Sequence, residues 1–187
     1  MTGLNGEYFE MLDKANEISS RRKVILFLGG NIGNMEIEEA YEFCNALKSK
    51  LNPNDILLIG FDLKKNPHTI LAAYNDKAGI TSSFNLNLLT RINEELAADF
   101  NIDQFSHYQT YDPLSGACRS YLISIEDQKV HIDDQEIRFK ANEAVYMEIS
   151  QKYSEKEIDI MARKTGFKPL KQISDTRGWF VDAIWKV

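Results

Sequence analysis

The chain has 187 residues, of which 43% are hydrophobic, and its 22 Lys and Arg against 28 Asp and Glu give a formal net charge of −6. This acidic balance argues against nucleic acid or an anionic membrane surface as the main partner. No apolar run approaches the roughly 18 residues that a membrane helix needs, and the acidic start MTGLNGEYFEML lacks the apolar region of a signal peptide. We therefore expect a globular protein with no membrane partner and a sizeable core.

The cysteines and histidines predict neither disulfides nor a metal site. Cys44 and Cys118 form no paired or ligand-like pattern, and the three histidines are scattered without ligand spacing. Cys44 lies on the apolar side of an expected helix. A reducing cytoplasm is the expected location, and no metal is assigned.

The N-terminal third has the alternation of an α/β domain. Residues 5–19 predict a helix, and the continuous apolar run in RRKVILFLGG is typical of a parallel strand covered on both faces. Residues 35–51 repeat apolar side chains at helical spacing, with Asn34 as the expected N-cap. The run ILLIGFDL is a second apolar strand. Strand, helix and strand in this order predict a right-handed crossover.

The middle of the chain changes character. Residues 66–76 and 83–98 predict two amphipathic helices, the second with Ser82 or Ser83 as its N-cap. Residues 105–153 contain five short segments rich in aromatic and β-branched residues, separated by turn signals, which predict a meander of strands.

The C-terminal segment returns to the first pattern. Residues 155–164 predict a helix ending near Gly166, and KPLKQISD with GWFVDAIWKV predicts an antiparallel hairpin. The expected fold class is α/β, with a frame from residues 1–64 and 151–187 and an α+β insertion from residues 65–150.

The stretch FLGGNIGN is the first candidate site. It lacks the G-x-G-x-x-G spacing of a dinucleotide loop, so a tight turn between a strand and a helix explains it equally well on local grounds. Its position favours binding, because ligands in open α/β sheets lie beyond the carboxyl ends of strands. There Gly29 would let the backbone approach a ligand, and Asn34 offers both a donor and an acceptor.

The stretch VYMEISQKY, residues 145–153, is the second candidate site. Side chains alternate along a strand, so Glu148 and Ser150 project side by side, and a carboxylate beside a hydroxyl suits a ring with two nitrogens. From periodicity alone, an ordinary solvated strand face is the more frequent explanation. Tyr74 ends the first of the two middle helices, where it could be a core aromatic with its hydroxyl at the rim.

Six stretches of the chain, taken in order, resemble the histidine-specific N-methyltransferase family. They are FLGGNIGN, ILLIGFDLKKNP, AAYND, AGITSSFNLNLL, RINEELAADF and MEISQKY. The resemblance covers residues 6–187. It implies S-adenosylmethionine as cofactor and trimethylation of the α-amine of histidine to hercynine, the first step of ergothioneine synthesis. The implied fold is part of a Rossmann-like methyltransferase sheet with a substrate-binding insertion.

The resemblance also implies roles for individual residues. Gly29 and Asn34 match loop residues that contact the amino-acid moiety of the substrate, and Tyr74 matches a tyrosine that holds its amine and carboxylate. Glu148 and Ser150 match the pair that recognises the imidazole.

Three further positions follow from the resemblance. Ser120 stands where family members often have a methionine lining the ring pocket, so the exact amino-acid substrate stays open. Glu7 and Tyr8 match a segment that touches the adenine side of the cofactor. No residue is assigned as the proton acceptor.

Several cofactor-binding motifs of the family are not found in this sequence. Family members carry the glycine motif for the cofactor, the ribose-binding carboxylate and a further substrate-binding tyrosine in a segment N-terminal to this one. We expect this chain to be a fragment with an incomplete cofactor site that does not turn over alone. An exposed apolar sheet edge along VILFLGG would then favour homo-oligomers. The alternatives are methylation of another amino acid, with Ser120 shaping a pocket for an indole, and a non-catalytic binding or assembly module.

Overall fold

A computed structural model describes residues 2–187. The contacts within the chain divide it into two compact units. The first consists of Met1–Lys64 and Gln151–Val187, and the second of Lys65–Ser150. Each unit has its own hydrophobic core.

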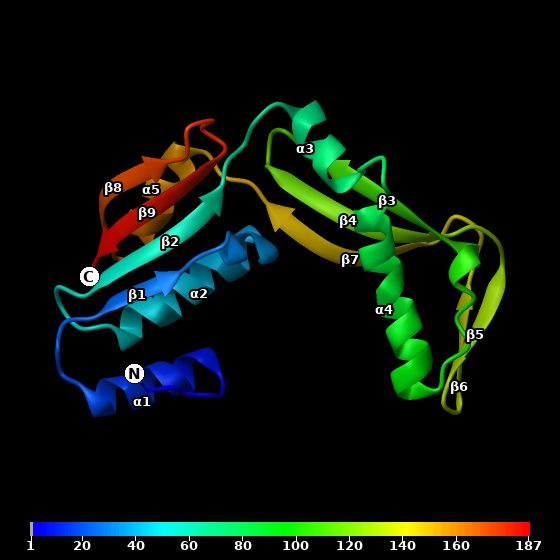
Figure 1. Cartoon of the computed structure of the whole chain (residues 1–187), viewed down its shortest axis with the longest axis horizontal. Coiled ribbons are helices and arrows are strands. Elements are labelled where there is room, and N and C mark those ends of the chain that lie inside the picture. Colours follow the sequence, from blue (N-terminus) through cyan, green and yellow to red (C-terminus); the bar gives the residue numbers. More distant parts are fainter. Residues whose placement is uncertain (1) are drawn as a thin grey trace. The chain divides into compact units, whose positions relative to one another are not determined.

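The first unit is built on a four-stranded sheet in the order β1-β2-β9-β8 (Figure 1). Strands β1 and β2 are parallel, with Val24 opposite Ile56, and β9 runs antiparallel to both β2 and β8. This arrangement confirms the α/β class, a crossover connection between the parallel strands β1 and β2, and the terminal hairpin. The elements of this unit are α1 (Tyr8–Ile18), β1 (Val24–Phe27), the 3₁₀ helix η1 (Asn31–Asn34), α2 (Ile37–Lys50), β2 (Ile56–Asp62), α5 (Glu155–Lys164), β8 (Lys168–Ser174) and β9 (Phe180–Lys186).

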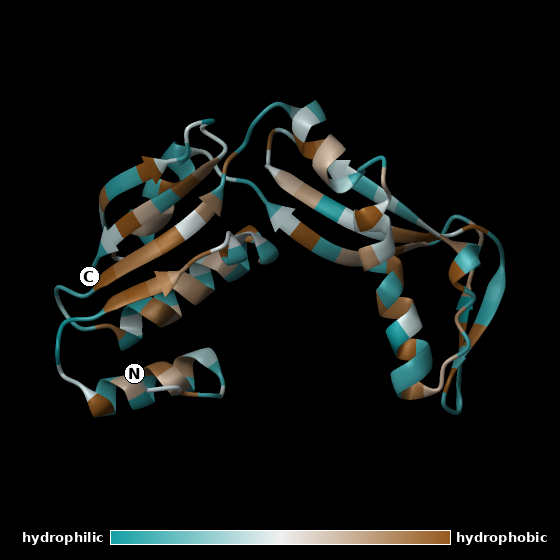
Figure 2. Cartoon of the chain, in the orientation of Figure 1, coloured by the Kyte–Doolittle hydropathy of each residue, from teal (hydrophilic) through white to brown (hydrophobic). Residues whose placement is uncertain are grey.

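The core of this unit lies on one face of the sheet. Alternate residues of β2 and β9, such as Ile59 and Trp185, pack with the buried faces of α2 and α5. Figure 2 shows β1 and β2 as largely hydrophobic, yet Val24 and Leu26 are 56% and 60% exposed. The expectation that β1 is covered on both faces was therefore wrong for this chain. Helices α2 and α5, which pack into the core, cover only one face of the sheet.

The start of α2 also differs from the expectation. Asn34 ends the 3₁₀ helix η1, and two residues separate it from α2. The N-cap is Glu36, whose backbone N–H donates to the Glu39 carboxylate at 2.9 Å in a capping box. Asn34 was thus wrongly expected to cap α2, because a 3₁₀ turn comes between the glycine loop and the helix.

The second unit combines a three-stranded sheet of order β3-β4-β7 with a separate hairpin, β5-β6. All five predicted strands are present, but they do not form a simple meander, since β7 returns to pair with β4 after the hairpin. The core gathers around Leu89, Phe105 and Leu122. The elements are α3 (Pro67–Tyr74), α4 (Ile80–Leu96), the 3₁₀ helix η2 (Ile102–Gln104), β3 (Phe105–Tyr111), β4 (Ala117–Ser124), β5 (Gln128–Ile132), β6 (Gln135–Phe139) and β7 (Ala144–Gln151).

Helix α4 begins earlier than expected. The carboxylate of Asp76 accepts hydrogen bonds from the backbone N–H groups of Ile80 and Thr81, both at 2.9 Å. These bonds, with Thr81 first, lower the pKa of Asp76 to about 2. The expectation that Ser82 or Ser83 caps the helix was wrong, because one carboxylate with two oxygens satisfies two terminal N–H groups at once.

Candidate functional site

The glycine loop follows the carboxyl end of β1. Gly29 and Gly30 have φ angles of 79° and 75°, in the left-handed region that favours glycine. A Cβ atom on Gly29 would meet no heavy atom within 4 Å, so the space in front of this residue is open. Asn34, at the other end of η1, is exposed. The loop therefore presents bare backbone at Gly29 and an accessible amide at Asn34.

Gly33 anchors this loop from behind. A Cβ atom on Gly33 would lie 2.8 Å from the carbonyl oxygen of Gln151, which is too close for any side chain. Gly33 is itself buried, and its N–H donates to the carbonyl of Gly30 at 2.9 Å. Gly33 could not be singled out from the sequence, because a close approach between residues over a hundred positions apart leaves no local signal.

A polar cluster in the second unit surrounds Glu148. Its Oε1 atom accepts from Nδ2 of Asn85 at 3.4 Å and lies 3.3 Å from Oγ of Ser120. Asn85 is 3% exposed and Ser120 is 1% exposed. Oγ of Ser120 also lies 2.7 Å from Oε1 of Gln109, to which it donates. Helix α4 and strands β3, β4 and β7 thus each contribute one polar side chain to a largely buried cluster.

Tyr74 and Ser150 form a second contact in the same unit. The hydroxyl of Tyr74, the last residue of α3, donates to Oγ of Ser150 at 2.7 Å. Ser150 lies two residues after Glu148 on β7, so both project from the same side of the strand. The resemblance assigns Tyr74 to the amino-acid end of the substrate and Ser150 to the ring end, and the structure brings the two hydroxyls together.

Sequence reasoning missed Asn85 and Gln109. Asn85 lies four residues before the core residue Leu89, on the apolar side of α4, where a buried amide needs partners. That position is a usable signal. Gln109 sits opposite Ser120 in the ladder of β3 and β4, and this register becomes visible only when the strands pair.

Glu7 and Tyr8 lie at the start of α1. The carbonyl of Glu7 accepts from the N–H of Met11 at 2.9 Å. Tyr8 is 66% exposed, and its ring meets Phe27 edge to face with centroids 6.2 Å apart. A cavity of about 250 Å³ beside them is lined by apolar side chains, including Ile25 and Phe43. An apolar slot with aromatic walls fits the flat face of an adenine ring.

Within residues 2–187, no group of three or more His, Cys, Asp and Glu side chains is placed to hold a metal ion. No helix in that part of the chain is long and apolar enough to cross a membrane.

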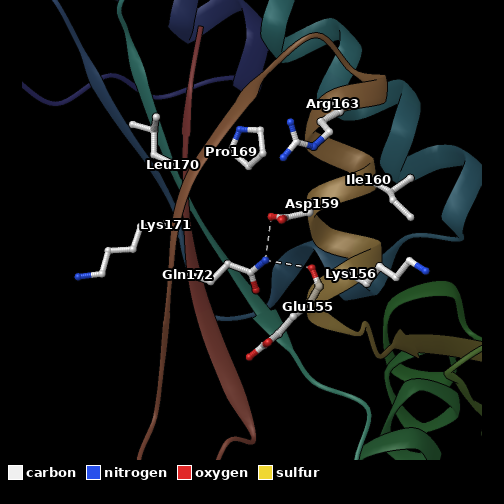
Figure 3. Close-up of a pocket in the computed structure, with 9 residues that line it drawn as sticks. All are labelled: Glu155, Lys156, Asp159, Ile160, Arg163, Pro169, Leu170, Lys171 and Gln172. Carbon is white, nitrogen blue, oxygen red and sulfur yellow. Dashed lines mark hydrogen bonds between the residues drawn. The ribbon is translucent and has the colours of Figure 1, made fainter.

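A groove of about 720 Å³ lies between α5 and β8 (Figure 3). The Gln172 amide bridges the carbonyl oxygen of Glu155 and the carboxylate of Asp159, both at 2.9 Å. The groove carries charges of both signs, including Lys156 and Arg163. None of the predicted site residues lines it, and we assign it no role.

Comparison with known proteins gives a consistent set of matches. Residues 1–187 match the family model described as "Histidine-specific methyltransferase, SAM-dependent". Histidine N-alpha-methyltransferase from Mycolicibacterium smegmatis is 32% identical over 177 residues, which cover 94% of this chain and 54% of that protein. Ergothioneine biosynthesis protein 1 from Schizosaccharomyces pombe is 29% identical over 168 residues, covering 89% of this chain and 22% of that protein.

L-tryptophan methyltransferase trpM from Psilocybe serbica is also similar, with 26% identity over 147 residues, 76% of this chain and 40% of that protein. The chain therefore spans about half the length of the bacterial relative and less of the fungal ones.

Proposed function

We propose that this chain, which belongs to the histidine-specific, SAM-dependent methyltransferase family, forms the amino-acid-binding part of an enzyme that methylates the α-amine of histidine. The proposal extends to the place of that reaction in ergothioneine synthesis, for which one of the relatives is named.

The polar cluster at Glu148 carries the proposal. In the described part of the chain, Glu148 meets only neutral donors, the Asn85 amide and the Ser120 hydroxyl. Its negative charge is not balanced by a neighbouring Lys, Arg or His there, which favours a ligand that brings an N–H group or a positive charge. An imidazole ring supplies both. Ser150, on the same side of β7, is proposed as the partner of the second ring nitrogen.

The other predicted residues are proposed to hold the amino-acid end of the substrate. Gly29 offers an accessible backbone, and Asn34 offers an amide that can both donate and accept. Tyr74 contributes a hydroxyl at the junction of the two ends, given its contact with Ser150. Ser120 is proposed to shape the ring pocket through Glu148.

These roles suit the chemistry of N-methylation. Bound S-adenosylmethionine supplies a methyl group on a sulfonium, and the substrate amine must reach it unprotonated, in line and away from bulk water. Positioning of this kind can supply roughly 7 to 11 kcal/mol of the barrier reduction. The chain's residues therefore need only to clamp the substrate and aim its amine, and no covalent nucleophile is required.

The cofactor site is proposed to be incomplete in this chain. The apolar slot lined by Tyr8 and Phe27 is proposed to take the adenine ring, and Glu7 is proposed to contact the adenine side of the cofactor, as the resemblance implies. We expect these 187 residues to bind an amino acid but not to transfer methyl groups by themselves.

The cellular setting is part of the same proposal. Cys44 and Cys118 are both buried and form no disulfide in the described part of the chain, and burial raises the pKa of the Cys44 thiol to about 12. A reducing cytoplasm is the proposed location, since a buried thiol with a raised pKa, such as that of Cys44, is poorly reactive. Strand β1 ends the sheet order, and with Leu26 exposed it is the proposed contact for self-association.

A second candidate function is methylation of tryptophan. One relative is named for that substrate, and Ser120 departs from the methionine that the resemblance would place in the ring pocket. An observation against tryptophan is that an indole ring has a single N–H group. That group could pair with Glu148 or with Ser150, but not with both.

The test is binding of a panel of amino acids to this chain, measured as shifts in melting temperature and by calorimetry. We expect histidine to stabilise the chain and tryptophan, phenylalanine and lysine to have less effect. Stabilisation by tryptophan above histidine would support the second candidate. The absence of any response, with the chain shown to be folded, would favour a non-catalytic assembly module.

A further inference from the structure

Asn85 makes two contacts that together fix its orientation. Its Nδ2 group donates one hydrogen bond to the carbonyl of Thr81, one turn earlier in α4, at 3.2 Å, and another to Oε1 of Glu148 at 3.4 Å. A side-chain amide has two N–H donors, so both are engaged. Asn85 is also 3% exposed, which removes it from competition by bulk water.

The contacts at Glu148 are all on one oxygen. Asn85 donates to Oε1, and Oγ of Ser120 lies 3.3 Å from the same oxygen, while no donor in the described part of the chain contacts Oε2. Contacts on one oxygen from two directions restrict rotation of the carboxylate, so its second oxygen keeps a preferred direction. The hydroxyl of Ser120 has one proton and its shorter contact is to Gln109 at 2.7 Å, so the Asn85 amide is the principal donor to Glu148. The two contacts come from different elements, α4 and β4, which makes the arrangement a property of the folded unit.

We propose that Asn85 is a positioning residue that sets the specificity of this site, by holding Oε1 of Glu148 so that Oε2 is aimed at a ring N–H of the bound amino acid. The inference rests on the proposed function, because it concerns how that same site reads its substrate. Asn85 acts through Glu148 and does not contact the substrate itself.

The test compares two ligands that differ at the ring. Histidine has ring nitrogens, whereas 2-thienylalanine has a five-membered aromatic ring of similar shape with no N–H. Affinities of both for the 187-residue chain are measured by calorimetry in the parent, in Asn85→Ala and in Asn87→Ala. Asn87 is exposed on the same helix, so Asn87→Ala makes the same chemical change away from Glu148.

We expect Asn85→Ala to weaken histidine binding about fivefold, the order of one net hydrogen bond, with 2-thienylalanine unchanged. Asn87→Ala should change neither affinity. In a Glu148→Gln background, Asn85→Ala should cause no further loss of preference, because the group that it positions has lost its charge.

Three results would contradict the inference or its premise, and they can be told apart. Equal weakening of both ligands by Asn85→Ala would indicate a purely structural role and overturn the inference. An Asn85→Ala variant with both affinities equal to those of the parent would overturn it as well. Equal binding of the two ligands by the parent chain would instead overturn the proposed function, together with the inference that depends on it.

A second measurement decides the matter if Asn85→Ala does not fold. Side-chain amide protons of Asn85 in the parent chain should exchange slowly with solvent in nitrogen-resolved NMR spectra. In Glu148→Gln their resonances should shift while those of Asn93, whose amide bonds to the backbone of Phe100, stay in place. Unshifted Asn85 resonances would contradict the positioning contact.

Discussion

The close approach of Gly33 to Gln151 allows a specific prediction for the glycine loop. In Gly33→Ala the new Cβ atom would lie 2.8 Å from the carbonyl oxygen of Gln151 and 3.5 Å from its nitrogen. Both are backbone atoms and cannot rotate away, so η1 or the strand end must shift. Overpacking of this kind costs about 1–3 kcal/mol.

One opposing effect has to be subtracted. Alanine restricts the unfolded chain more than glycine does, which stabilises the folded state by about 0.4–1 kcal/mol where the backbone allows it. The net prediction for Gly33→Ala is a loss of about 1–2 kcal/mol in the free energy of unfolding. The same shift should displace Asn34, which lies next to Gly33, and weaken amino-acid binding.

The assay is urea unfolding followed by tryptophan fluorescence. Trp185 is fully buried in the core of the first unit, the unit that contains Gly33, so its emission reports on the relevant transition. Gly3→Ala is the control, because a Cβ atom there would meet no heavy atom within 4 Å. A midpoint for Gly33→Ala equal to those of the parent and the control would refute the reasoning.

Three further predictions concern other parts of the chain. Tyr153→Phe should leave the stability unchanged or raise it by about 1 kcal/mol, because the buried hydroxyl has no hydrogen-bond partner among residues 2–187; a clear loss in urea unfolding would show that the hydroxyl is satisfied. The lowered pKa of Asp76 means that its capping contribution is present above the ordinary carboxyl pKa of about 3.9 and is lost as the pH falls from there towards about 2. Helix content by circular dichroism should fall in that window in the parent but not in Asp76→Ala, and identical acid profiles would contradict the assignment. Leu26→Lys should reduce self-association through the β1 edge, seen as a lower mass by light scattering; a parent chain that is already monomeric at all concentrations would rule out the proposed contact.

The order of elements in this chain could be predicted because hydrophobic periodicity is a local property. The apolar runs at β1 and β2 and the spacing in α2 and α5 each identify their own element without reference to the rest of the chain. The starts of α2 and α4 were misplaced for a physical reason. Asp76 caps α4 from four residues before Ile80, a reach that a search for Ser, Thr, Asp or Asn directly before a helix does not cover.

The candidate site was only partly predictable. Alternation along β7 predicted that Glu148 and Ser150 lie on one side of the strand, and the family resemblance assigned them to recognition of the imidazole. The contacts of Asn85 and Gln109 depend on how α4 and β3 pack in the second unit. Such long-range packing cannot be predicted from any short stretch of sequence. The exposed side chains of Val24 and Leu26 show the opposite case, where a local apolar pattern predicts a cover that the described residues do not provide.

The most direct test of the central claim is a titration of the ¹⁵N-labelled chain with histidine, followed by NMR. The account predicts that the backbone amides of Glu148 and Ser150 and the side-chain amides of Asn34 and Asn85 shift in a saturable way, and that 2-thienylalanine moves the first two far less. Saturable shifts confined to other residues, such as those lining the groove between α5 and β8, would contradict the assignment of this site.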